Sequence, residues 1–251
     1  MRNRIEFSVW GRFAMFTDPL TRVGGEKRSY HLPTYEALKG IAKSIYWKPT
    51  FIWVIDEVRI MKRIRTQTKG VKPIKFGGGN DLSIYTFITG DPDPVTAIPR
   101  VEYQVRAHFE WNEHRPELKQ DRNEHKHYQI AVRMLERGGR QDIFLGTRDC
   151  QGYVSPCEFG SGKGNYDADA RTPTGVMFHG FDYPDETGRH ELATRFWCPA
   201  MEHGIIRFVR PEHCTIRRVV HTMTPKFFGI GTNLLEVTAE FQRVEPQSEL
   251  A

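Results

Sequence analysis

The sequence lacks the long apolar runs of a membrane protein and the leader of a secreted one. No stretch approaches the roughly 18 consecutive apolar residues that a membrane-spanning helix needs. Residues 1–16 alternate polar and apolar side chains, whereas a secretory signal has a basic region followed by an apolar block. The sequence therefore predicts a cytoplasmic protein that does not contact membranes.

Cysteine is scarce, and acidic clusters are missing. The four cysteines are too few and too scattered for a disulfide scaffold. Cys150 and Cys157, the closest two, are separated by six residues, which does not match the paired spacing of zinc ligands. The acidic run 182–186 is typical of a turn, and nothing assembles a two-metal carboxylate cluster. We therefore expect no metal and no cofactor.

Positive charge is only modestly in excess, but it is concentrated in one segment. Lys and Arg total 36 against 31 Asp and Glu, so net charge alone does not indicate nucleic-acid binding. Residues 62–75 hold six cations and no acid, and the glycine-rich run 76–80 that follows permits a hairpin or a finger. The segment is a candidate RNA-binding surface. The alternative is a solvated charged hairpin, because few aromatic residues are interleaved.

Hydrophobic periodicity predicts an α+β fold in the first 150 residues. A period of two indicates strands at 4–10 and 101–111, the strongest strand signal lies at 51–61, and a short last strand is expected at 143–145. Helical spacing follows Pro33 and again follows Asp121 or Asn123, either of which can cap the second helix. The order strand, helix, strand, strand, helix, strand is that of a ferredoxin-like, RNA-recognition-like domain, here with a basic hairpin insertion.

The composition and hydrophobic pattern of the chain change after about residue 152. Short, aromatic-rich strands are expected at 176–181, 191–197, 205–209 and 216–220, as in a small antiparallel β domain. We therefore expect two domains, residues 1–150 and residues 151–251. Beyond Thr232 the pattern fits a helix or an extended tail equally well.

The densest group of titratable side chains is the segment Asn123–Tyr128 at the start of the second helix. Imidazole transfers protons near neutral pH, and an ammonium group stabilises the charge of a phosphorane. A helix N-terminus also attracts phosphate. Lys126 and His127 are therefore candidates for phosphodiester cleavage. In an arbitrary protein, however, a solvated polar helix start would be the better interpretation, and His125 is expected to be merely exposed.

Tyr46, at the end of the first helix, is a second candidate. Both helices of a ferredoxin-like fold pack on one face of the sheet, so the end of one can face the start of the other. A phenol there could orient or deprotonate a ribose hydroxyl. On composition alone, ordinary packing of a tyrosine at a helix end is the better interpretation.

Motifs along most of the chain carry a family resemblance. They are Phe16–Leu20, Gly24–Lys27, Pro33–Ala42, Ser44–Pro49, Phe76–Asn80, Asp121–Glu124, Lys126–Tyr128, Asp142–Gly146, Cys150–Val154, Pro156–Gly162, His179–Phe181 and Tyr183–Gly188. These segments resemble the subtype I-C (Dvulg) branch of the CRISPR-associated Cas5 family. The similarity extends to about Lys226, while the loop 91–100 and the last 25 or so residues look individual to this chain.

This resemblance implies metal-independent cleavage of precursor CRISPR RNA within its repeat hairpin. The family's catalytic Tyr, Lys and His fall on Tyr46, Lys126 and His127. The implied reaction is attack of a ribose 2′-hydroxyl on the adjacent phosphate, after which the protein stays bound to the product as a type I-C Cascade subunit. Expected RNA contacts are Arg22, Lys27, Lys62, Arg63, Lys69, Lys72 and Lys75.

Two other functions remain open at this point. A Cascade subunit that only caps the 5′ handle of guide RNA would bind without cleaving, although it has no need of the intact catalytic set. A metal-dependent DNA nuclease, suggested by the nonspecific DNA nicking associated with some relatives, would need a carboxylate cluster that the sequence does not show. Expected partners are therefore repeat RNA, other Cascade subunits and, nonspecifically, DNA.

Overall fold

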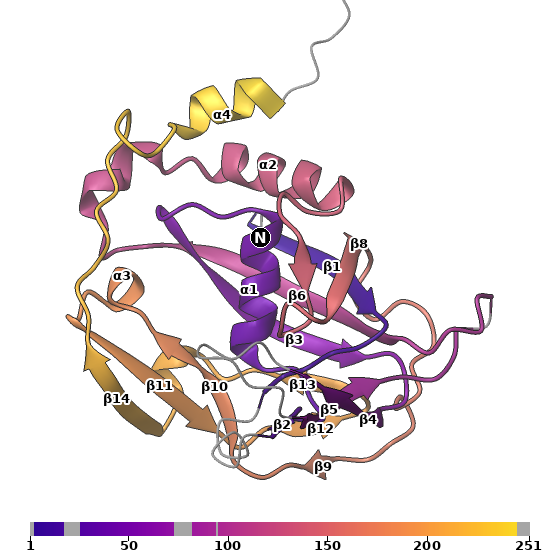
Figure 1. Cartoon of the computed structure of the whole chain (residues 1–251). Coiled ribbons are helices and arrows are strands. Elements are labelled where there is room, and N and C mark those ends of the chain that lie inside the picture. Colours follow the sequence, from indigo (N-terminus) through magenta and orange to yellow (C-terminus); the bar gives the residue numbers. More distant parts are fainter. Residues whose placement is uncertain (1–2, 18–25, 73–81, 94, 245–251) are drawn as a thin grey trace, which may run out of the picture.

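The computed structural model describes residues 3–17, 26–72, 82–93 and 95–244 (Figure 1). The fold is a mixed α+β structure dominated by antiparallel sheets, which confirms the predicted class. Within the described residues, no helix is long and apolar enough to cross a membrane.

One eight-stranded sheet forms the centre of the molecule, in the order β7-β8-β1-β6-β3-β13-β12-β9. All of its pairings are antiparallel. Its strands are β1 (Arg4–Gly11), β3 (Phe51–Ile60), β6 (Val101–Trp111), β7 (Ile143–Phe144), β8 (Gln151–Pro156), β9 (Thr172–Pro173), β12 (Ala200–Glu202) and β13 (Ile205–Arg207). The strands predicted at 4–10, 51–61 and 101–111 are confirmed.

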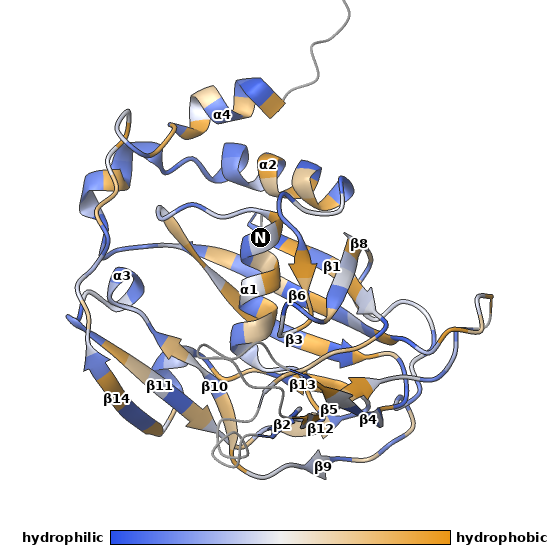
Figure 2. Ribbon diagram, in the orientation of Figure 1, coloured by the Kyte–Doolittle hydropathy of each residue, from blue (hydrophilic) through white to orange (hydrophobic). Residues whose placement is uncertain are grey.

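The alternation of β1 shows why these residues form strands. Ile5, Phe7 and Val9 are buried, while their neighbours along the strand remain partly accessible. Orange and blue segments alternate along the central strands in Figure 2, as this pattern requires. The inward side chains join a single core that also takes in both long helices.

The two long helices begin at side-chain caps. In α1 (Tyr35–Ile45), the Thr34 side chain accepts a hydrogen bond from the Ala37 amide, so the helix starts two residues after Pro33. In α2 (Glu124–Glu136), Asn123 and not Asp121 is the cap, and it accepts from the Lys126 amide. The helices touch each other, and α2 also contacts β1 and β8.

The basic segment forms half of a hairpin. Strand β4 (Arg65–Val71) pairs with β5 (Ser83–Thr89), and β2 (Lys27–Arg28) lies parallel to β5 on its other side. The antiparallel pairing of β4 with β5 agrees with the expected hairpin, and the glycine-rich run 76–80 lies outside the described part of the chain.

The rest of the chain adds a second three-stranded sheet and a terminal helix. The sheet has the order β10-β11-β14 and is antiparallel. Within the tail that the sequence leaves undecided, residues 237–244 form a helix that lies across α2 (Figure 1). These elements are β10 (Met177–Asp182), α3 (Pro184–Thr187), β11 (Glu191–Trp197), β14 (Ile216–Thr222) and α4 (Val237–Val244), with short 3₁₀ helices η2 (Pro116–Asp121) and η3 (Pro211–His213).

The predicted boundary at residue 150 does not coincide with an edge of the central sheet. Strand β8 follows that boundary and pairs directly with β1, and β9, β12 and β13 extend the same sheet beyond β3. Strand β13, expected in the small appended sheet, therefore lies in the large one. Among the described strands that follow residue 150, β10, β11 and β14 form a sheet that is separate from it.

Candidate active site

The fold brings Tyr46 and His127 into direct contact although 81 residues separate them. Tyr46 follows the last turn of α1, and its own amide donates to the Ala42 carbonyl as the C-terminal cap of the helix. His127 lies in the first turns of α2. The Tyr46 hydroxyl is 2.9 Å from His127 Nδ1, as the expectation that the two helix ends face each other requires.

The hydrogen-bond partners of His127 fix its tautomer. Its Nε2 lies 2.8 Å from the main-chain carbonyl oxygen of Asp121, which can only accept, so Nε2 carries the proton. Burial lowers the pKa of His127 to about 4, so the ring is neutral at physiological pH. Its Nδ1 is then an acceptor, and the Tyr46 hydroxyl donates to it.

Both side chains of this pair are inaccessible to solvent, with 0% exposure. Phe51 packs against both rings, and Trp111 packs against the His127 ring. Burial, followed by the negative charges of Glu240 and Asp121, raises the pKa of Tyr46 far above its usual value. The phenol is therefore a neutral hydrogen-bond donor, oriented by the imidazole.

Lys126, the third predicted catalytic residue, does not contact the Tyr46–His127 pair in this structure. Its side chain is half-buried, and Nζ donates to the Thr238 hydroxyl of α4 at 2.8 Å. Its backbone amide is held by the Asn123 cap. The adjacent position in the chain keeps it at the same helix N-terminus as His127.

Three buried polar side chains beside this pair were missed by the sequence reasoning. The carboxylate of Asp121 accepts from the Thr50 hydroxyl at 2.7 Å and lies 3.3 Å from Lys48 Nζ. One of its oxygens is 3.7 Å from His127 Nε2. Asp121 was considered only as a helix cap, and no local pattern distinguishes a buried acid from an exposed one before a helix.

The terminal helix α4 covers this group. Lys48 Nζ also lies 3.2 Å from the Glu240 carboxylate and donates to the Leu235 carbonyl. Glu240 is only 4% exposed and also forms an ion pair with Arg140. In Figure 1, α4 lies along α2 at the end of the molecule where α1 finishes. Access to Tyr46 and His127 is therefore closed from this side.

The described residues among the predicted RNA contacts lie elsewhere, in or next to strands β2 and β4 of the β2-β5-β4 sheet (Figure 1 shows the sheet). Lys27 Nζ lies 4.8 Å from the ring centroid of Tyr85, and Lys69 Nζ lies 3.4 Å from that of Phe13. The tertiary fold thus supplies aromatic neighbours that are not interleaved in the sequence. Lys62 Nζ is 3.9 Å from Glu102, while Arg63 and Lys72 are exposed. Arg22 and Lys75 lie outside the described residues.

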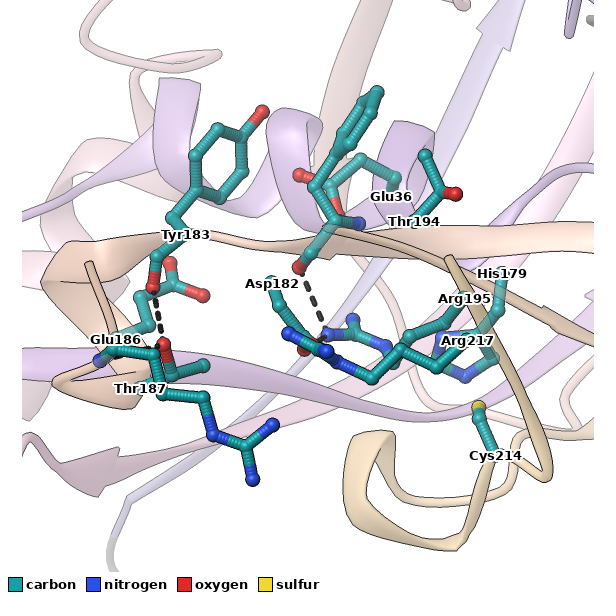
Figure 3. Close-up of polar contacts among 12 residues, drawn as sticks. Glu36, His179, Asp182, Tyr183, Glu186, Thr187, Thr194, Arg195, Cys214 and Arg217 are labelled. Atoms are coloured by element: carbon teal, nitrogen blue, oxygen red, sulfur yellow. Dashed lines mark hydrogen bonds and ion pairs between the residues drawn. The ribbon is translucent and has the colours of Figure 1, made fainter. Parts of the chain in front are cut away.

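A second buried polar cluster lies on the β10-β11-β14 sheet (Figure 3). The Asp182 carboxylate pairs with both Arg195 and Arg217, so one acid joins residues from all three strands. The cluster borders a cavity of about 490 Å³. Two nitrogens of Arg195, Nε and Nη2, have no hydrogen-bond partner within the described part of the chain. No nucleophile is paired with a base among these groups, so we assign the cluster a structural role.

The cysteines and acids of the described residues show no group of three or more metal-ligating side chains. All four cysteines are free: Cys150 is buried, Cys157 and Cys214 are half-buried, and Cys198 is exposed. Burial raises the pKa of the Cys150 and Cys157 thiols to about 11, so both are protonated and unreactive at neutral pH.

Comparison with known proteins places this geometry in context. Residues 4–209 match the Cas5d model of the family described as CRISPR-associated protein (Cas_Cas5). A CRISPR pre-crRNA endoribonuclease Cas5d from Mannheimia succiniciproducens is 33% identical over 121 residues, covering 43% of this chain and 53% of that protein. The chain thus spans about half the length of this relative. A protein of the same name from Thermus thermophilus is 28% identical, covering 75% and 78%.

Two solved structures share both sequence and fold with the chain. One, described as a CRISPR-associated protein, is 32% identical with a TM-score of 0.70. The other is a functionally uncharacterized protein from Streptococcus mutans, 35% identical with a TM-score of 0.68. In each case 86% of this chain and 96% of the other are covered.

Proposed function

The chain belongs to the CRISPR-associated Cas5 family, in its Cas5d branch, and on that basis we propose that it is an endoribonuclease that cleaves precursor CRISPR RNA within the repeat hairpin. Two relatives carry the name of this activity. The single observation that supports it most directly is the 2.9 Å contact between Tyr46 and His127, the two catalytic candidates that are distant in sequence.

In the proposed reaction, the ribose 2′-oxygen attacks the adjacent phosphorus and the bond from phosphorus to the 5′-oxygen breaks. The products are a 2′,3′-cyclic phosphate and a free 5′-hydroxyl. Tyr46 positions the attacking hydroxyl, and neutral His127 orients Tyr46. The hydrogen-bonded pair takes up the 2′-hydroxyl proton and returns a proton to the leaving 5′-oxygen. Proton transfer by positioned groups is typically worth about 10²–10⁴-fold in rate. Lys126 stabilises the charge of the phosphorane.

The reaction so proposed needs no metal and no cofactor. After cleavage, the protein stays on its product as a subunit of type I-C Cascade. The β2-β5-β4 sheet, with Lys27, Lys62, Arg63, Lys69 and Lys72, is the proposed grip on the RNA backbone, joined by Arg22 and Lys75. The affinity of this surface for RNA should fall steeply as the salt concentration rises.

The finer layout of the fold is also part of the proposal. We regard β1, α1, β3, β6, α2 and β8 as a ferredoxin-like unit, supported by their antiparallel order β8-β1-β6-β3. In it, β8 takes the place predicted for residues 143–145. The β10-β11-β14 sheet is then the core of the smaller second domain.

The test is cleavage of the cognate repeat RNA in excess EDTA. Wild type should cut at one site, and a single 2′-deoxy substitution immediately 5′ of that site should abolish cutting. Lys126→Ala should lose activity by about 10²-fold or more. Lys119→Ala, an exposed lysine of η2, is the matched control and should cut normally. Cutting that requires added metal, or that survives the deoxy substitution, contradicts the proposal.

A second candidate function is a non-catalytic subunit that caps the 5′ handle of guide RNA. The 0% exposure of Tyr46 and His127 favours it, because neither side chain reaches solvent as the chain is folded here. Wild type that binds the repeat RNA and leaves it whole under every metal condition would support this function.

A further inference from the structure

Glu240 of α4 is a buried acid that pairs with cations next to the catalytic candidates. Glu240 is 4% exposed, although an acidic side chain on a terminal helix would ordinarily face water. Its two carboxylate oxygens contact different cations, Lys48 and Arg140. Glu240 therefore occupies an anion site built by residues from outside its own helix.

These cations are fixed next to Tyr46. Lys48 is two residues beyond Tyr46 and only 4% exposed. Arg140 follows α2, and its amide and that of Gln141 both donate to the Ser44 carbonyl at 3.0 Å, which ties the Arg140 loop to the end of α1. The charge of Glu240 contributes to the pKa of both Tyr46 and His127, which places the carboxylate within electrostatic reach of both.

Three cations at this end of the molecule contact oxygens of residues 235–240, and one of them, Lys48, also pairs with Asp121. Lys48 donates to the Leu235 carbonyl, and Lys126 donates to the Thr238 hydroxyl. Oxygen acceptors for such cations are what a phosphodiester backbone presents. A pocket of about 520 Å³ adjoins this site and adds aromatic surface, lined by Lys43, Trp47, Lys48, Arg140, Phe228 and Glu240.

We propose that Lys48 and Arg140, beside Lys126, form a phosphate-binding site for the RNA, and that Glu240 fills this site in the free protein until RNA displaces α4. The proposal rests on the proposed function, since it places the site next to the groups that cleave. Lys48 and Arg140 are then substrate-binding residues. The family match ends at residue 209, so α4 is a feature outside the matched region.

The apolar anchorage of α4 is modest, although its polar contacts include a hydrogen bond from the Val237 amide to the buried Asp121. The helix has eight residues, and only Val237 and Glu240 are buried. Phe241 lies under Arg133 at 5.0 Å, at the surface of α2. Loss of these contacts would open the side of the molecule from which Tyr46 and His127 are covered. If RNA binds only the form with α4 displaced, its apparent affinity is reduced by the small fraction of protein in that form.

The test compares two substitutions that remove the same charge from the same segment. Glu240→Gln should bind the cognate repeat RNA about 5-fold or more tightly than wild type, because the competing carboxylate is gone. Glu236→Gln, at an exposed position four residues earlier, should bind like wild type. The probe is fluorescently labelled repeat RNA with one 2′-deoxy residue at the mapped cleavage site, or unmodified RNA if none is cut.

Adding Arg140→Ala to Glu240→Gln should reverse the gain and lower the salt dependence of binding by about one phosphate contact. Arg140 has a side chain that is 49% exposed, so its removal does not threaten the fold. Equal affinities of Glu240→Gln and Glu236→Gln for the RNA would overturn the proposal.

A second measurement needs no variant. On binding repeat RNA, the wild-type amides of residues 237–244 should exchange hydrogen faster, while those of α1 and β3 should not. Unchanged or stronger protection of α4 in the RNA complex would also overturn the proposal. If these tests succeed but no protein cuts RNA, the phosphate site stands and the catalytic function fails. If RNA is cut but these tests fail, the catalytic function stands and the phosphate site is wrong.

Discussion

Lys48 and Asp121 form an ion pair that is almost wholly withdrawn from water, with Nζ 3.3 Å from Oδ1 and side-chain exposures of 4% and 0%. Lys48 follows α1, whereas Asp121 ends η2 immediately before α2. Asp121 also accepts from the Val237 amide of α4. The pair therefore joins the ends of three helical segments at the point where Tyr46 meets His127.

Asp121→Asn should destabilise the protein by about 3–5 kcal/mol, because it leaves the buried Lys48 ammonium without its full counter-charge. The free energy of unfolding in urea measures this. Asp169→Asn, which removes the same charge from an exposed position, should change stability by less than about 0.5 kcal/mol. Similar losses for the two variants would show that the buried pair is not a major stabilising contact.

Tyr46→Phe should retain the fold and lose cleavage. The ring still packs against Phe51 and His127, so we expect a stability loss of only about 1 kcal/mol for the missing hydrogen bond. Single-turnover cleavage in EDTA should fall by about 10²-fold or more. Tyr35→Phe, which removes the hydroxyl of another buried tyrosine at the far end of α1, should cleave at the wild-type rate. An active Tyr46→Phe enzyme would remove Tyr46 from the mechanism.

The free energy of unfolding should decrease as the pH is lowered from about 6.5 to about 5. Burial lowers the pKa of His127 and His179 to about 4 from an ordinary value of 6.5, so the unfolded chain binds protons in this range before the folded one does. The two buried neutral histidines therefore contribute their full stabilisation above pH 6.5, and this contribution is lost as the pH falls toward 4. The expected loss is about 1.5 kcal/mol per histidine.

Urea unfolding of wild type and His179→Gln at the two pH values measures this effect. The variant should lose about half of the pH dependence of the free energy of unfolding. The comparison stays below pH 6.5 because His108, whose pKa is raised by its hydrogen bond to Asp56, acts in the opposite direction at higher pH. Equal stability at both pH values would mean that these histidines are protonated in the folded state.

Two glycine-to-alanine substitutions should have opposite effects. Gly146 has φ of +97°, and a Cβ there would lie 2.0 Å from the Met15 carbonyl oxygen, so Gly146→Ala should cost about 2 kcal/mol or more. Gly40 is in α1 and a Cβ there meets nothing within 4 Å, so Gly40→Ala should stabilise by about 0.5–1 kcal/mol. Chemical denaturation of both variants measures the difference, and a tolerated Gly146→Ala would contradict the close approach.

Local patterns determined most of the secondary structure. The period of two in β1 and β6 and the helical spacing of α1 and α2 are properties of neighbouring residues, and each element formed where its pattern indicated. Those patterns reflect burial of one face, which depends on side-chain order alone. The helicity of residues 237–244 was undecided, because so short a segment is stabilised by what it packs against and not by its own propensity.

The sequence also determined which residues are candidates for chemistry, since Tyr46, Lys126 and His127 were selected from residue type, position and family resemblance. Only the tertiary structure decided how they meet. It joined Tyr46 to His127, fixed the tautomer through the Asp121 carbonyl, and placed Glu240 on Lys48 and Arg140. Apart from the contact of His127 with the Asp121 carbonyl, these contacts join residues 81 or more positions apart. They depend on how helices pack over a shared sheet, and no local pattern encodes that packing.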